Sequence, residues 1–153
     1  MCYTQQEQTF LQEVTHMKYS KIFPLDTFPA PKYVVTFARY QGQWLFSRHR
    51  SRTTWETQGG HIEEGESALD AARRELYEES GATEFTITPL FDYWHGDRTG
   101  SGVGVVFLVE ITALGPLPES EMAEVRTFDT LPDNVTYPDI TPYLFDAITK
   151  GCP

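Results

Sequence analysis

Three glutamates, Glu75, Glu78 and Glu79, have a spacing that could hold a divalent metal ion. At roughly 100° of helical rotation per residue, Glu75 and Glu79 lie almost above one another and Glu78 lies beside them. Like charges at these spacings repel by about 0.2–0.5 kcal/mol for each pair, so a helix that carries several of them favours a bound cation. Carboxylate oxygens are suitable ligands for Mg²⁺ or Mn²⁺. The spacing therefore predicts a metal site, although a solvated acidic helix face would carry the same residues.

The residues around these glutamates predict a helix with defined ends. Ser67 is a good N-cap, and Asp70 three residues later can complete a capping box. Gly81 follows the last turn, where a left-handed C-cap favours glycine. Arg74 can pair with Asp70 one turn earlier or with Glu78 one turn later, which would orient a carboxylate. Helical spacing predicts an apolar face made of Ala68, Leu69, Ala72 and Leu76.

The segment from Gly60 to Ala82 resembles the Nudix box of the Nudix hydrolases, G-x5-E-x7-R-E-U-x-E-E-x-G-U, in which U is a bulky aliphatic residue. Ala82 is small for the final U, and Gln58 stands where many members carry proline, which predicts a less rigid loop. The matching positions are Gly60, Glu66, Arg74, Glu75, Leu76, Glu78, Glu79 and Gly81. Eight matches at fixed offsets make the resemblance specific.

The resemblance implies a role for most of the matched residues. The implied metal ligands are the carbonyl of Gly60 and the carboxylates of Glu75, Glu78 and Glu79. Glu75 is implied either as a ligand or as the general base, with Arg74 orienting it, and these two complete the implied catalytic set together with Glu78 and Glu79. Glu66 would support the loop and the helix. Mg²⁺ is the implied cofactor, with Mn²⁺ as a substitute, and the identity of the base stays open.

A further carboxylate outside the box could complete the metal site. Glu121 and Glu124 precede a predicted strand and could fold over the metal. Glu124 is the preferred candidate, while a solvated acidic loop would explain either residue equally well.

Candidate substrate contacts come from a basic run and from aromatic residues. Arginine matches phosphate oxygens with its planar fork, which favours Arg48 and Arg50 among the basic residues Arg48, His49, Arg50 and Arg52. The candidates for stacking on a base are Trp55, Tyr33, Phe28 and Tyr137, with Trp55 preferred and core packing as the alternative. Residues 94–98 are expected to open a loop, either a mobile lid or a plain surface loop.

Composition narrows the class of protein. The chain has 153 residues and a net charge of −10, so a nucleic-acid polymer is not an expected partner, because such binding depends on basic side chains. No apolar run is long enough to cross a membrane and no signal peptide is visible, which predicts a cytoplasmic protein. Cys2 and Cys152 are expected to be free thiols rather than a disulfide.

The rest of the chain predicts one α/β domain over residues 1–153. Residues 1–12 are expected to be frayed or a short helix, and residues 13–31 an irregular or edge-strand lead-in. Strands are predicted over residues 32–39, 44–50, 55–58, 84–94, 103–112 and 125–128. A closing helix is predicted over 139–150, with Tyr143, Leu144, Ala147 and Ile148 facing inward. The resemblance implies the Nudix α/β/α sandwich, a mixed sheet flanked by helices.

The expected function follows from the resemblance. It implies Mg²⁺-dependent hydrolysis of a pyrophosphate bond in a nucleoside diphosphate linked to a group X. A small domain of this kind looks most like the MutT-type enzymes, which convert an ordinary or oxidised nucleoside triphosphate to the monophosphate and pyrophosphate. Nucleotide sugars, dinucleotide cofactors, dinucleoside polyphosphates and capped RNA ends stay open as substrates, since loops outside the box select them. A non-catalytic Nudix-fold module that binds a nucleotide or a protein is the alternative, and a homodimer is a further expectation.

Overall fold

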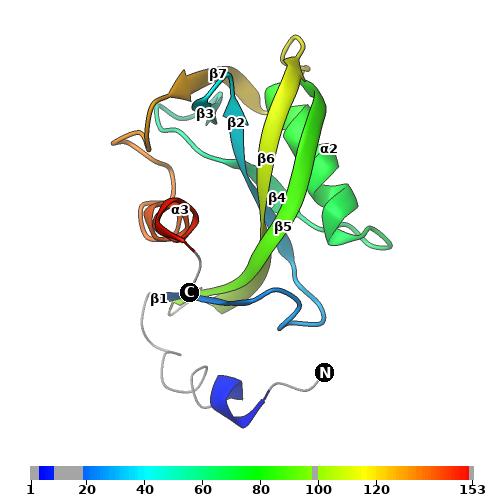
Figure 1. Ribbon diagram of the computed structural model, residues 1–153, viewed down its shortest axis with the longest axis vertical. Coiled ribbons are helices and arrows are strands. Elements are labelled where there is room, and N and C mark those ends of the chain that lie inside the picture. The colour runs from blue at the N-terminus through cyan, green and yellow to red at the C-terminus, as the bar shows by residue number, and fades with distance from the viewer. Residues whose placement is uncertain (1–3, 9–18, 98–99, 152–153) are drawn as a thin grey trace.

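The computed structural model describes residues 4–8, 19–97 and 100–151, which form a mixed sheet with one helix on each face (Figure 1). The elements in chain order are β1 (Tyr19–Pro24), β2 (Tyr33–Tyr40), β3 (Gln43–His49), β4 (Gln58–His61), α2 (Ala68–Ser80), β5 (Ala82–Asp97), β6 (Gly100–Leu114), β7 (Met122–Phe128) and α3 (Thr141–Lys150). Residues 5–8 form a short helical segment before them. The predicted α/β class, with a mixed sheet between helices, is confirmed.

The seven strands are ordered β1-β5-β6-β2-β3-β7, and β4 pairs with β2 away from this path. The β2–β6 pairing is parallel and the other pairings are antiparallel. β2 pairs with β4 through Tyr33–Thr36 and with β3 through Ala38–Tyr40. Because β3 leaves β2 after these pairs, β4 can lie against the first half of β2. This arrangement brings the paired glycines of the box into the sheet, directly beside α2 (Figure 1).

Helix α2 has the predicted ends and packs on one face of the sheet. The Ser67 side chain accepts a hydrogen bond from the Asp70 N–H, and Gly81 adopts the left-handed conformation with a φ of 83°. The predicted apolar face is wrong at Leu69, which is 39% exposed, because Ala71 takes the buried position beside Ala72 and Leu76. The other predicted positions are correct, since Ala72 and Leu76 are buried and Ala68 packs against the core.

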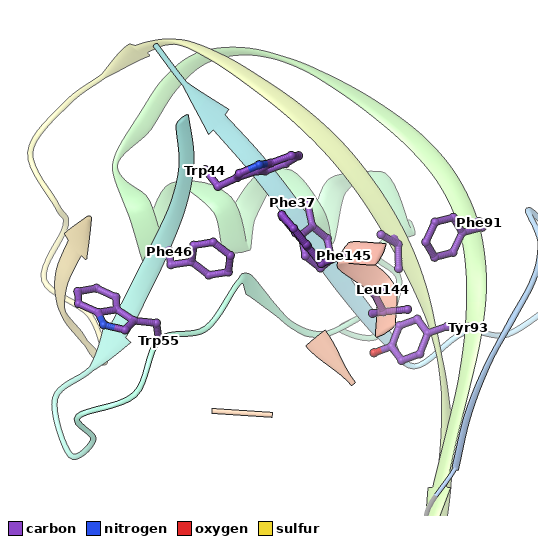
Figure 2. Close-up of a cluster of buried hydrophobic side chains, with 9 residues drawn as sticks. Phe37, Trp44, Phe46, Trp55, Phe91, Tyr93, Leu144 and Phe145 are labelled. Carbon is purple, nitrogen blue, oxygen red and sulfur yellow. The ribbon is translucent and has the colours of Figure 1, made fainter. Parts of the chain in front are cut away.

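Helix α3 covers an aromatic core on the opposite face of the sheet (Figure 2). The buried residues of this core are Phe37, Trp44, Phe46, Trp55, Phe91, Tyr93, Val106, Leu144 and Phe145. The predicted inward position of Tyr143 is wrong, since this side chain is 43% exposed and Phe145 is buried instead. The helix begins at Thr141 rather than at 139, and Pro142 stands in its first turn, where proline is well tolerated.

The predicted bounds of one strand and of one loop are wrong, because strand pairing covers other residues than expected. The predicted strand over 55–58 lies instead at Gln58–His61, while Trp55 and Glu56 form isolated bridges to Val135 and Ser47. The loop predicted to open at Trp94 is strand to Asp97, because β5 pairs with β6 down to the partners Asp97 and Gly100. Residue 98, the end of the expected lid, lies outside the described residues.

Further expectations concern the N-terminal region, the two cysteines and membrane-spanning helices. β1 forms an edge strand within the region 13–31 that was expected to lead in to the sheet. Cys2, Cys152 and most of residues 1–12 lie outside the described residues. Within the described part of the chain, no helix is both long and apolar enough to span a membrane.

Candidate active site

The close approach of β4 to α2 builds the centre of the site. The Gly59 N–H donates a 2.7 Å hydrogen bond to the Glu79 carboxylate. A Cβ atom added to Gly60 would lie 2.7 Å from Oε1 of Glu75, and one added to Gly59 would lie 2.2 Å from the backbone oxygen of Val34. Only glycine therefore fits at these two positions without displacing a catalytic candidate or the neighbouring strand.

Arg74 organises the acidic side chains around it. Its guanidinium forms a two-pronged pair with Glu66, with nitrogen–oxygen distances of 2.8 and 2.9 Å, and it donates to Glu75 at 2.7 Å. It also donates to the carbonyl of His61 at 3.2 Å and lies 3.5 Å from Glu78. One cation thus links the loop before α2 to two of the predicted metal ligands. This is consistent with the predicted supporting role of Glu66 and orienting role of Arg74.

The surroundings of the carboxyl groups in the site give them different pKa values. The hydrogen bonds from Arg74 and from the Glu63 N–H lower the pKa of Glu66 to about 2. Burial raises the pKa of Glu79 to about 8, and the nearby charges of Glu75, Glu56 and Glu121 add to that rise. Burial also raises the pKa of Glu75, although Arg74 opposes the effect. Glu66 is therefore a permanent anion, whereas Glu79 without a cation holds its proton near neutral pH.

The donor set fits a divalent cation. Glu79 is partly buried, three nearby carboxylates disfavour its negative charge, and a bound cation would offset their effect. Within the described ranges no three acidic, histidine or cysteine side chains already converge as a metal cage. Glu75 instead faces Arg74, and one oxygen of Glu79 faces the Gly59 N–H. A cation here would have to draw these carboxylates together, a rearrangement that metal binding commonly drives.

Glu56 is a site residue that the sequence did not reveal. It is buried, and its Oε2 accepts hydrogen bonds from Thr136 at 2.8 Å and from Arg52 at 3.2 Å. It stands close enough to Glu79 to raise the pKa of that group. No spacing rule relates Glu56 to the box, because its approach depends on the bridge between Glu56 and Ser47. Arg52, expected as a phosphate contact, is paired with Glu56 instead.

The two additional carboxylate candidates lie in different surroundings. Glu121 is exposed and near His49, with 3.7 Å between His49 Nε2 and Glu121 Oε2, and its charge raises the pKa of Glu79. Glu124 pairs with Arg48 at 3.2 Å and with Arg126 at 2.9 Å, and these arginines lower its pKa. Glu124, the preferred sequence candidate, remains a prediction, and the described contacts favour Glu121 as the neighbour of the box glutamates.

The residues predicted to contact the substrate do not form one cluster in the structure. Arg48 is engaged with Glu124 and with the carbonyl of Arg52, and Arg50 donates to the carbonyl of Ser120 at 2.8 Å. Trp55 is 6% exposed and packs against Phe128 with 5.2 Å between ring centroids. Trp55 therefore fills the core, which leaves little of its ring for stacking on a base.

A cavity of about 550 Å³ adjoins the glycine strand on the α3 side of the sheet. Its lining residues are Tyr33, Val34, Val35, Glu56, Thr57, Gly59, Gly60, His61, Tyr93, His95, Asp97, Gly100, Ser101, Gly102, Tyr137, Ile140, Thr141 and Leu144. One part of the cavity therefore lies at Glu56 and Gly59, next to the box, and another part lies at α3. The volume falls within the range of about 300–1,000 Å³ that is usual for small-molecule sites.

Two of the four stacking candidates reach this cavity. Tyr33 and Tyr137 line it, and the Tyr33 ring lies 4.7 Å from the ring of His61. Phe28 is 3% exposed and packs edge-on against Phe23, outside the cavity lining. Tyr93 also lines the cavity, and no sequence pattern predicted it as a candidate because its position depends on strand pairing.

The family model for the NUDIX domain matches residues 30–143. A solved structure of a variant of the Bacillus subtilis pyrophosphohydrolase BsRppH is similar to this chain with a TM-score of 0.70 and 25% identity. That similarity covers 86% of this chain and 85% of the other.

Two curated relatives are similar over shorter stretches. One is a Bacillus subtilis protein provisionally named 8-oxo-dGTP diphosphatase YtkD, 39% identical over 64 residues, which are 42% of this chain and 40% of the relative. Another is the RNA pyrophosphohydrolase of Bartonella henselae, 45% identical over 53 residues, or 34% of this chain and 31% of the relative. The alignments thus span less than half of either relative.

Proposed function

Because the chain belongs to the Nudix family, we propose that it hydrolyses a pyrophosphate bond in a nucleoside diphosphate linked to a group X, with Mg²⁺ as cofactor. The proposed substrate is a nucleoside triphosphate, ordinary or oxidised, which would yield the monophosphate and pyrophosphate. The observation that carries the proposal is the partly buried Glu79 beside Gly59, whose pKa is raised by the nearby carboxylates of Glu75, Glu56 and Glu121. Such a cluster has little stability of its own without a cation.

Each box residue has a distinct part in the proposed reaction. Glu78 and Glu79, with the carbonyl of Gly60, would hold the cation, and Glu75 would act as a ligand or take the proton of the attacking water. Arg74 keeps Glu75 oriented through its 2.7 Å hydrogen bond. When bound, the cation supplies charge neutralisation at the phosphates and a more acidic water.

The cavity supports a nucleotide as the substrate. Its Glu56 and Gly59 end adjoins the box, so a substrate with phosphates at the glutamates would place its nucleoside between Tyr33, Tyr137 and α3. The aromatic lining suits a planar base better than a sugar. We also propose a cytoplasmic location and assembly as a homodimer. Both suit an acidic nucleotide-cleaving enzyme of this family.

A second candidate substrate is the 5′ triphosphate end of an RNA. It is favoured by the similarity to the RNA pyrophosphohydrolase of Bartonella henselae. The net charge of −10 limits contacts to a long RNA backbone, so only the terminal nucleotides would be bound. A non-catalytic binding module is less well supported, because Glu75, Glu78 and Glu79 are all present.

The test is a phosphate and pyrophosphate release screen with Mg²⁺ or Mn²⁺. The panel holds ordinary and oxidised nucleoside triphosphates, nucleotide sugars, dinucleotide cofactors, dinucleoside polyphosphates and a short 5′-triphosphorylated oligoribonucleotide. Turnover of one class that is lost in Glu79→Gln supports the proposal and identifies the substrate. Absence of turnover across the panel, with nucleotide still bound, would favour the binding module.

A further inference from the structure

Two tyrosines of the cavity lining, Tyr33 and Tyr93, lie on either side of a glycine of strand β6. Tyr93 on β5, Gly104 on β6 and Tyr33 on β2 are register partners, so all three face the same side of the sheet. A Cβ atom on Gly104 would lie 2.3 Å from the Tyr93 ring, and one on Gly102 would lie 2.4 Å from the Tyr33 ring. The two glycines therefore allow both tyrosine rings to lie close against β6 and leave the space above them open.

The side chain of Tyr93 is largely buried, and no hydrogen bond of its hydroxyl to the described residues is present. The side chain is only 6% exposed, yet Tyr93 lines the cavity. Figure 2 shows its hydroxyl pointing away from β5 toward the α3 side. A tyrosine hydroxyl that faces a cavity and has no protein partner can form a hydrogen bond with a ligand. Burial also raises the pKa of Tyr93, so the group stays a neutral hydroxyl that can donate or accept.

A second hydroxyl borders the same end of the cavity. Thr141, the first residue of α3, is 3% exposed and lines the cavity, and no hydrogen bond of its side chain is present in the described part of the chain. Leu144 from the same helix and Val35 from β2 line the wall beside these groups. The part of the cavity beside α3 is thus lined by apolar side chains and the Tyr93 ring, with the hydroxyls of Tyr93 and Thr141 as polar groups.

We propose that Tyr93 is a specificity-determining residue whose hydroxyl forms a hydrogen bond with the polar edge of the substrate's nucleobase, with Thr141 as a second contact. The inference rests on the proposed function, because it assumes that phosphates lie at the Glu56 and Gly59 end. A planar heterocycle between aromatic rings is the ligand chemistry that fits this compartment. Because a neutral hydroxyl can donate or accept, Tyr93 selects for the presence of a polar base edge rather than for one base.

Binding measurements without metal test this proposal independently of turnover. The affinities of the four nucleoside 5′-monophosphates and of ribose 5-phosphate are measured by calorimetry for the unaltered protein and for Tyr93→Phe. Loss of one neutral hydrogen bond is expected to weaken nucleoside monophosphate binding roughly 3- to 10-fold. Ribose 5-phosphate, which lacks a base, is expected to bind both proteins equally. In turnover assays the same variant is expected to raise KM and to leave kcat nearly unchanged, since Tyr93 does not contact the glutamates.

Matched variants make the result specific. Tyr143→Phe removes a hydroxyl from α3 at a 43% exposed position outside the cavity and is expected to bind every probe normally. Thr141→Val is expected to weaken the same nucleotides as Tyr93→Phe. Equal nucleotide affinities in Tyr93→Phe and the unaltered protein would overturn the proposal. An equal loss of affinity for ribose 5-phosphate in Tyr93→Phe would also overturn it. A failure of the unaltered protein to bind any of the nucleotides would do the same.

The binding result also separates this inference from the proposed function. If the unaltered protein binds nucleotides with the Tyr93 dependence but hydrolyses nothing, the base contact stands and the proposed hydrolysis fails. If turnover is found and Tyr93→Phe has no effect on affinity or KM, the hydrolysis stands and the base contact fails.

Discussion

The backbone N–H of Gly59 donates a 2.7 Å hydrogen bond to the carboxylate of Glu79, which joins the glycine strand β4 to helix α2. This contact holds one carboxylate oxygen of the partly buried Glu79, and the charges of Glu75, Glu56 and Glu121 raise the pKa of the group. A carboxyl with a pKa raised to about 8 is ready to exchange its proton for a cation. The first three predictions concern this part of the site.

Glu79→Gln is expected to abolish most of the activity and to leave the fold intact. Glutamine can still accept the Gly59 hydrogen bond, but it cannot supply the negative charge that a cation needs. Loss of a ligand or a proton acceptor is expected to lower kcat by roughly 10²–10⁴-fold. The measurement is steady-state turnover together with thermal unfolding. Glu84→Gln, an exposed glutamate after α2, serves as the control, and near-normal turnover of Glu79→Gln would contradict the metal assignment.

Gly60→Ala is expected to lower activity by displacing Glu75. The added Cβ would lie 2.7 Å from Glu75 Oε1, and the end of that side chain can swing away at small cost in stability. A misplacement of about 1 Å can reduce the rate about 100-fold. Gly115→Ala is the matched control, because its Cβ would meet only ordinary contacts at 3.4 and 3.5 Å. Equal turnover in the two variants would show that the position of Glu75 is not critical.

Addition of Mn²⁺ or Mg²⁺ is expected to stabilise the folded protein. A ligand bound only by the native state adds about 2.7 kcal/mol to the free energy of unfolding at 100 times its dissociation constant. The measurement is Tm as a function of metal concentration, followed by removal of the metal with a chelator. Glu79→Gln should show little of the shift and Glu84→Gln all of it. An unchanged Tm in the unaltered protein at saturating metal would indicate that α2 is only a solvated acidic helix.

The Glu66–Arg74 pair is expected to contribute stability that depends on pH. Arg74 lowers the folded-state pKa of Glu66 from 4.5 to about 2, so the contribution is complete above about pH 4.5 and is lost as the pH falls toward 2. Glu66→Gln should therefore lower Tm at pH 6–7 and have a diminishing effect between pH 4.5 and 2. A difference in Tm that is independent of pH over this range would mean that the ion pair is not its cause.

Glu121 and Glu124 are expected to differ in their effect on metal binding. Glu121 raises the pKa of Glu79 through its charge, whereas Glu124 is paired with Arg48 and Arg126. Glu121→Gln should weaken Mn²⁺ binding, and Glu124→Gln should change it little. Calorimetric titration of both variants checks this, and the reverse result would restore Glu124 as the additional ligand.

The sequence was informative wherever the chemistry depends on local spacing. Ser67, Gly81 and the positions of Glu75, Glu78 and Glu79 all belong to one helix, and helical geometry alone relates them. Strand positions were also predictable to within a few residues where β-rich runs are bounded by turns, as at Gln41 and Gly42. The error at Leu69 shows the limit of this reasoning, because a small rotation of the helix decides whether a residue at the edge of its apolar face is buried.

By itself, then, the sequence determined the acidic helix, its caps, the arginine within it and the mixed α/β class, since these follow from residues close together in the chain. Only the tertiary structure decided that Glu56 lies near Glu79, that Trp55 is core, and that Tyr33 and Tyr93 of the cavity lining flank Gly104. Those relationships depend on which strands pair and in which register. A shift of one residue in register would turn every side chain of a strand to the opposite face, and no local pattern around Tyr93 specifies that choice.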